Sequence, residues 1–112
     1  MTAKQVVELP EPVLVVRGEF GDGLVEVVGR KVATIAKHAH EPVLAIRFEF
    51  DRHTDPAVAD PVTVHASVDV NGRLVHATAT GRGARDALDL AVDRVTRQLD
   101  DRPHAHRRQR RH

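Results

Sequence analysis

Arginine side chains near the C-terminus are the groups of this chain best suited to binding another molecule. The segment 102–112 holds five arginines and no acidic residue. Planar guanidinium groups match the oxygens of phosphate, so a cluster of this kind is typical of contact with nucleic acid. A terminus that only increases solubility is the alternative interpretation. The arginines predicted here to contact RNA are Arg107, Arg108, Arg110 and Arg111.

The rest of the chain has the opposite charge. The whole sequence carries a formal net charge of +1, from 17 basic and 16 acidic residues. Removing the five arginines of segment 102–112 leaves 12 basic residues against 16 acidic ones, or −4 for residues 1–101. A weakly acidic body with a strongly basic tail favours nucleic-acid contact through local basic patches.

Further basic residues fall on two segments with helical periodicity, 24–39 and 84–99. RNA in A-form geometry is bound through its shape and phosphates, which requires Arg and Lys at spaced positions. If the helices lie side by side, these residues could form one stripe. Interleaved aspartates favour the alternative, a solvated face with the i, i+4 salt bridges Arg82–Asp86, Arg85–Asp89 and Asp93–Arg97. The candidate RNA contacts in this region are Lys31, Arg94, Arg97, Arg30, Lys37 and Arg82.

Histidine and serine offer little for metal binding or catalysis. Two of the histidine pairs, His38-x-His40 and His104-x-His106, have a spacing that a metal could use, but the chain has no cysteine. A structural metal site needs about four ligands, so we expect no metal and no cofactor. Ser67 is the only serine and lies inside a predicted strand. Without a phosphate loop or a nucleophile–base pattern, we expect no enzyme activity and no small-molecule substrate.

The stretch 62–81 is the strongest structural signal. Asn71-Gly72 suits the central positions of a type I′ turn, which require positive φ. Valine and alanine alternate with polar residues along 62–70, and a second alternating run follows over 74–80. The sequence therefore predicts a β-hairpin. His65 and His76 could pair across its two strands, but a role at the surface is the better interpretation.

Two helices and two further strands complete the pattern. Apolar residues at 24, 28, 32, 35 and 39 predict a helix, with Asp22 as its N-cap. A second helix, from Ala84, is expected to end at Asp101 and Pro103. The short run 12–17 predicts a strand, and 43–51 predicts another, whose apolar face comprises Leu44, Ile46, Phe48 and Phe50.

These elements follow the order β-α-β-β-β-α and indicate an α+β fold. Strands with one apolar face and amphipathic helices predict one four-stranded, mostly antiparallel sheet with both helices packed on one face. The first two strands should be parallel, because a β-α-β connection makes a right-handed crossover. We expect a flexible arm over 1–11, one domain over 12–101 and a disordered basic tail over 102–112.

The hairpin and second helix resemble a known family. Val70-Asn71-Gly72, Val75-His76-Ala77, Gly81, Ala87-Leu88-Asp89 and the run 94–99 resemble the C-terminal half of the ribosome hibernation-promoting factors, also called sigma-54 modulation proteins. The resemblance covers about residues 12–101 and is closer in the C-terminal half. It indicates a short or divergent form of the family.

The resemblance implies a function. Proteins of this family bind rRNA of the small ribosomal subunit, in the channel of mRNA and tRNA, and silence translation in stress or stationary phase without catalysis. By position, Lys31, Arg94 and Arg97 match basic residues of the family's helices. Two alternatives stay open: an interaction protein of the same fold that regulates another protein, and a general binder of structured RNA.

Composition limits where the chain can act. The longest uninterrupted apolar run, about 13–16, is too short to span a bilayer, and the N-terminus does not resemble a signal peptide. We therefore expect a cytoplasmic protein without a membrane partner, present as a monomer or weak dimer.

Overall fold

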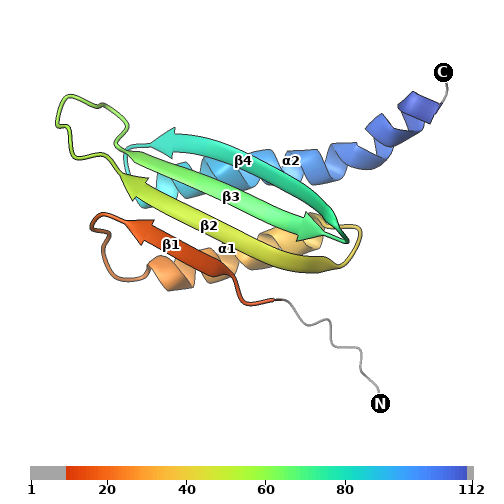
Figure 1. Ribbon diagram of the computed structural model, residues 1–112, viewed down its shortest axis with the longest axis horizontal. Helices are drawn as coiled ribbons and strands as arrows, with labels where there is room; N and C mark the ends of the chain where they lie inside the picture. Colours follow the sequence, from red (N-terminus) through yellow and green to blue (C-terminus); the bar gives the residue numbers. More distant parts are fainter. Residues whose placement is uncertain (1–9, 111–112) are drawn as a thin grey trace, which may run out of the picture.

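The computed structural model describes the backbone of residues 10–110 and the side chains of residues 10–100. One mixed sheet is covered on one face by two helices (Figure 1). The predicted order β-α-β-β-β-α and the α+β class are confirmed. The elements are β1 (Val13–Arg17), α1 (Leu24–His38), β2 (Val43–Arg52), β3 (Val62–Val70), β4 (Arg73–Gly81) and α2 (Ala84–Arg110).

The strands lie in the sheet in sequence order, β1-β2-β3-β4. β1 pairs with β2 in parallel, as predicted for the β-α-β connection, and the other two pairs are antiparallel. The predicted hairpin joins β3 and β4, with φ of 54° at Asn71 and 93° at Gly72. The side chain of Asp69 accepts a hydrogen bond from the Gly72 N–H at 2.9 Å and so supports this turn.

The core lies between the helices and one face of the sheet. Phe48 and Phe50 are fully buried, and the alternating valines and alanines of β3 and β4 lie beside them. One residue of the predicted apolar face is an exception. Leu44 is 54% exposed, because the register of β2 against β3 shifts between Val43 and Ala45. An irregularity of this kind breaks the strict alternation of strand faces.

The two helices differ from prediction at their ends. α1 buries the expected stripe of Val28, Val32 and Ile35, but its N-cap is Gly23 in the left-handed region, at φ 92°, and not Asp22. A left-handed residue at this position brings the chain from the preceding turn into the helix, and glycine adopts that conformation without strain. No side chain therefore caps α1.

The predicted end of the second helix at Asp101 and Pro103 is wrong. The helical backbone continues to Arg110, through most of the segment expected to be a disordered tail. A proline removes one backbone hydrogen bond, and a helix can continue past it with a kink. Figure 1 shows these last turns of α2 extending beyond the sheet. Residues 1–9 of the expected arm lie outside the described part of the chain.

Among the described residues, no helix is long and apolar enough to cross a membrane.

Candidate nucleic-acid interface

The two helices lie side by side and run in the same direction. A contact between the middle of α1 and the second turn of α2 joins Lys31 Nζ to Asp89 Oδ1 at 2.7 Å, and one near the end of α1 joins His38 Nδ1 to Asp100 Oδ2 at 3.0 Å. The helices therefore form one layer, opposite to the open face of the sheet (Figure 1). The predicted RNA contacts between residues 30 and 97 all lie on this layer, except Arg82, which comes just before α2.

Lys31 and Arg97 are already paired with carboxylates. The ammonium group of Lys31 lies in the seam between the helices, on Asp89, and its side chain is only 27% exposed. Arg97 contacts Asp93 at 3.1 Å, as predicted for this i, i+4 pair, and its side chain is 74% exposed. Both pairs face solvent, where ion pairs are weak and are screened by salt. A phosphate can therefore compete for either cation.

Arg94 has a structural contact. Its guanidinium donates a hydrogen bond to the backbone oxygen of Thr78 at 2.6 Å, and Gln98 donates one to the oxygen of His76 at 3.0 Å. These two side chains of α2 cover outward-facing carbonyls of the edge strand β4. At 3.6 residues per turn, Arg94 lies roughly 140° around α2 from Asp89. Lys31 and Arg94 are consequently on different sides of α2, so these two residues do not belong to one stripe.

The remaining candidates are exposed cations. Within residues 10–100, Arg30, Lys37 and Arg82 form no ion pair, and each is exposed. The first two are seven residues apart on α1, which is two helical turns, so they lie on the same side of that helix. Arg107, Arg108 and Arg110 fall on the helical backbone of α2, but their side chains, like all of Arg111, lie outside the described part.

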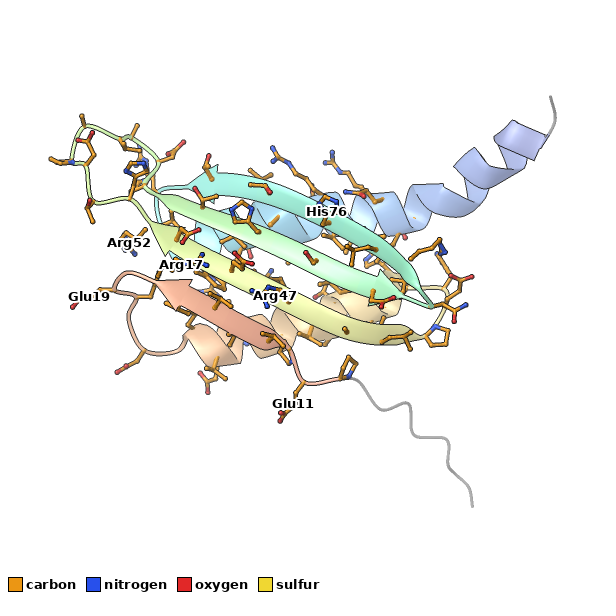
Figure 2. All side chains as sticks on the ribbon, in the orientation of Figure 1. Glu11, Arg17, Glu19, Arg47, Arg52 and His76 are labelled. Atoms are coloured by element: carbon orange, nitrogen blue, oxygen red, sulfur yellow. The ribbon has the colours of Figure 1, made fainter. Side chains whose placement is uncertain are left out.

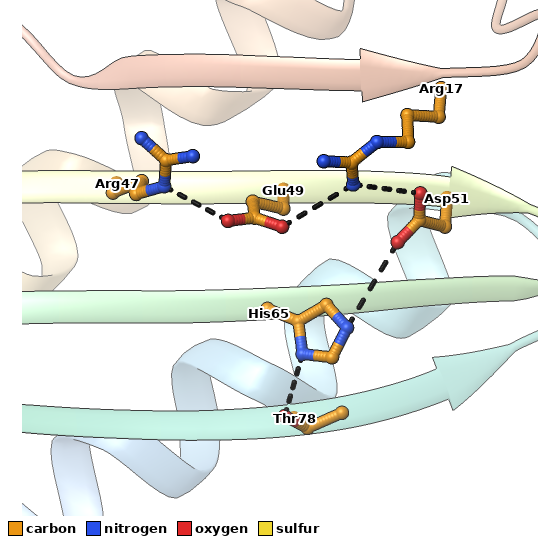
Figure 3. A network of polar contacts seen from close by, with 6 residues as sticks. All are labelled: Arg17, Arg47, Glu49, Asp51, His65 and Thr78. Atoms are coloured by element: carbon orange, nitrogen blue, oxygen red, sulfur yellow. Dashed lines mark hydrogen bonds and ion pairs between the residues drawn. The ribbon is translucent and has the colours of Figure 1, made fainter.

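The open face of the sheet carries a polar network across all four strands (Figure 3). Arg17 contacts Glu49 at 3.4 Å and Asp51 at 3.2 Å. Arg47 donates to Glu49 at 2.9 Å. His65 is 2.9 Å from the Thr78 hydroxyl and 4.0 Å from Asp51. His65 and His76 are both exposed on this face, as expected for a surface role. They do not pair with each other, since His76 lies opposite Ser67 and His65 opposite Thr78.

Electrostatics distinguish the two faces. Hydrogen bonds from Arg47 and then Arg17 lower the pKa of Glu49 below its usual value. The pKa of Arg17 is raised, chiefly by its hydrogen bonds to Asp51 and Glu49. Both arginines of the open face (Figure 2) are thus neutralised by neighbouring carboxylates (Figure 3). With Asp69, this face has two cations and three acids, a net charge of −1.

The helical layer has the opposite sign. Over residues 24–38 and 82–100 it holds seven Lys and Arg against five Asp and Glu, a net charge of +2. The sequence of the following turns of α2, 101–110, adds four arginines and one aspartate. Positive charge on one face and carboxylates on the other favour approach of a polyanion to the helices.

Comparison with known proteins identifies the family of this chain. The family model described as sigma 54 modulation protein / S30EA ribosomal protein matches residues 16–107. The chain belongs to this family. The resemblance seen in the sequence is therefore confirmed, and the family is one of ribosome-associated proteins. A search of curated proteins gave no match.

Solved structures show the same fold. The N-terminal domain of Protein Y from Thermus thermophilus is 20% identical, with a TM-score of 0.65, over 83% of this chain and 97% of that one. A ribosomal subunit interface protein from Coxiella burnetii is 15% identical, with the same TM-score and the same coverage of both chains. At these identities the likeness establishes the fold.

Two residues with potential roles were missed by sequence reasoning. Arg52, at the end of β2, and Arg85, in the first turn of α2, line one pocket together with Phe20. They are far apart in the sequence and belong to no motif. No sequence signal could have brought them together, because their proximity depends on the packing of β2 against both helices.

Proposed function

We propose that this chain binds rRNA of the small ribosomal subunit through its helical layer and inactivates or preserves ribosomes in stress or stationary phase. Membership of a ribosome-associated family supports this proposal, as does the structural likeness to the Coxiella protein, which is named a ribosomal subunit interface protein. In this function the chain acts by occupying a surface, without catalysis, in the cytoplasm.

The difference in charge between the two faces carries the proposal. RNA phosphates attract the helical layer, because its described part has a net charge of +2. The open face of the sheet has a net charge of −1 and offers them no such attraction. Arg30 and Lys37 form no ion pair among the described residues, so they can meet phosphate directly. Lys31 and Arg97 reach phosphate by exchanging their carboxylate partners for it.

Two matched double variants test this assignment. Arg30→Gln with Lys37→Gln removes two charges from the helical layer, and Arg17→Gln with Arg47→Gln removes two from the open face. Co-sedimentation with purified small subunits, at several salt concentrations, measures the affinity of each. The helical variant should bind more weakly, with a salt slope shallower by about 0.7–0.9 for each phosphate that the protein no longer neutralises. The sheet variant should bind like the original chain.

The outcomes distinguish the candidate functions. A larger effect of the sheet variant would contradict the proposal and place the RNA on the other face. If neither variant changes binding and the original chain does not sediment with small subunits, the interaction-protein alternative becomes the better one. Equal binding to small subunits and to unrelated structured RNA would indicate a general RNA binder. Replacing Arg107, Arg108, Arg110 and Arg111 by Gln in the full chain tests the contribution of the terminal arginines.

A further inference from the structure

A pocket of about 320 Å³ lies between the first turns of the two helices and the end of β2. Leu24, Val27 and Leu88 form its apolar part. Its volume is at the lower end of the range for small-molecule sites, which suits a flat group of a few rings. This site is separate from Arg30 and Lys37, which lie further along α1.

One wall of the pocket is planar and held in place. The guanidinium carbon of Arg52 lies 4.6 Å from the centre of the Phe20 ring, and Arg52 Nε donates to the Glu19 oxygen at 2.8 Å. Phe20 in turn packs edge-on against buried Phe50, with ring centres 5.8 Å apart. Figure 2 shows Arg52 and Glu19 at the same end of the sheet. Phe20 covers one face of this guanidinium, so the opposite face is the one available for stacking.

The polar groups around the pocket are of both signs. Arg85 supplies donors, as do the two Nη groups of Arg52, which make no hydrogen bond within residues 10–100. Asp22 and Glu26 supply acceptors. With two cations and two carboxylates, the lining has no net charge and gives a bare phosphate no net attraction. A nucleobase edge, by contrast, presents donors and acceptors together, so it matches both kinds of group.

We propose that this pocket binds an unpaired nucleobase of RNA, stacked on Arg52. This inference rests on the proposed function, in which the helical layer faces rRNA. It adds a site that contacts a base, whereas the other cations of the layer contact phosphates. Contacts of this kind are typical of single-stranded RNA, whose bases are free to leave the stack.

Titration by NMR tests the pocket without ribosomes. Guanosine and adenosine 5′-monophosphate should shift the amide signals of Gly21, Gly23 and Ala84, whereas ribose 5-phosphate, with the same phosphate and no base, should not. A single-stranded RNA tetranucleotide should bind more tightly than either mononucleotide. Equal shifts with ribose 5-phosphate, or none at millimolar concentration, would overturn the proposal. Tighter binding of the mononucleotide would overturn the assignment to RNA.

Two variants with controls locate the binding. Ala84→Leu places a larger side chain at the pocket and should abolish the shifts, while Ala33→Leu, on the exposed side of α1, should leave them unchanged. Should Ala84→Leu fail to fold, Arg85→Gln changes only an exposed side chain and should weaken binding, with Arg47→Gln as its control. Shifts that persist in Ala84→Leu, or binding by Arg85→Gln as tight as that of the original chain, would overturn the proposal. These titrations contain no ribosome. A failure of the proposed small-subunit binding would therefore be seen in the co-sedimentation experiment and not in the NMR titration.

Discussion

Gly81 joins the end of β4 to the start of α2, and it permits the close approach of the two elements. A Cβ atom added there would lie 2.7 Å from the Ala87 backbone nitrogen and 3.0 Å from the Asp86 Cβ. Real Cβ atoms do not approach backbone this closely, and the first turn of α2 cannot move away without unpacking buried Ala87 and Leu88. We therefore predict that Gly81→Ala destabilises the domain.

The magnitude follows from two opposing effects. Adding a methyl group to a packed site costs about 1–3 kcal/mol. Replacing Gly by Ala also reduces the freedom of the unfolded chain, which returns about 0.4–1 kcal/mol. The net loss in the free energy of unfolding should be about 1–2 kcal/mol, equivalent to a fall in Tm of roughly 5–10 °C for a domain of this size.

Gly29 provides the matched control. It lies inside α1, is exposed, and an added Cβ would meet nothing within 4 Å. Gly29→Ala should stabilise the domain by up to about 1 kcal/mol, because glycine is the poorer helix former. Urea unfolding followed by circular dichroism measures both variants. If Gly81→Ala proves as stable as the original chain, α2 is not seated on β4 as described.

Three further predictions concern the core, the ion pairs and pH. Ile46→Asp should unfold the domain, as seen by circular dichroism, because a carboxylate would replace a side chain that is 1% exposed and cost several kcal/mol. Asp89→Asn should release Lys31 for phosphate, so small-subunit affinity should rise and its salt slope steepen by about 0.7–0.9; unchanged binding would count against a role for Lys31. NMR titration should give Glu49 a pKa below its usual value, which rises in Arg47→Gln. Since this folded-state pKa is depressed, the stabilisation by Glu49 is present at neutral pH and is lost as the pH falls through it.

Local patterns made most of the fold predictable. The hairpin at Asn71-Gly72 depends on the φ angles of two neighbouring residues, and the alternation in β3 and β4 depends on the strand repeat alone. Both appear in the structure as predicted. The apolar stripe of α1 is equally local. These patterns predict the order of the elements. They also predict a sheet with both helices packed on one face.

The errors arose where several elements meet. Leu44 fits a strand alternation, but the register shift in the pairing of β2 with β3 exposes it. Residue type favours Asp22 as the N-cap of α1, whereas the backbone geometry selects Gly23. Pro103 predicts a helix end, although a proline can be accommodated inside a helix. In each case the local sequence permits more than one conformation, and the packing of neighbouring elements selects between them.

The charges of the helical layer show why site residues are harder to predict than folds. Spacing along α2 predicts that Arg85 pairs with Asp89, but Asp89 instead contacts Lys31 of α1. That choice partly neutralises a cation expected to meet RNA, and it leaves Arg85 without an ion pair among the described residues, on the rim of the pocket beside Arg52. Packing α1 against α2 therefore pairs the cation in the seam between the helices and leaves one at the start of α2 without a carboxylate among the described residues. Spacing within one helix cannot reveal this, because the competing partner belongs to the other helix.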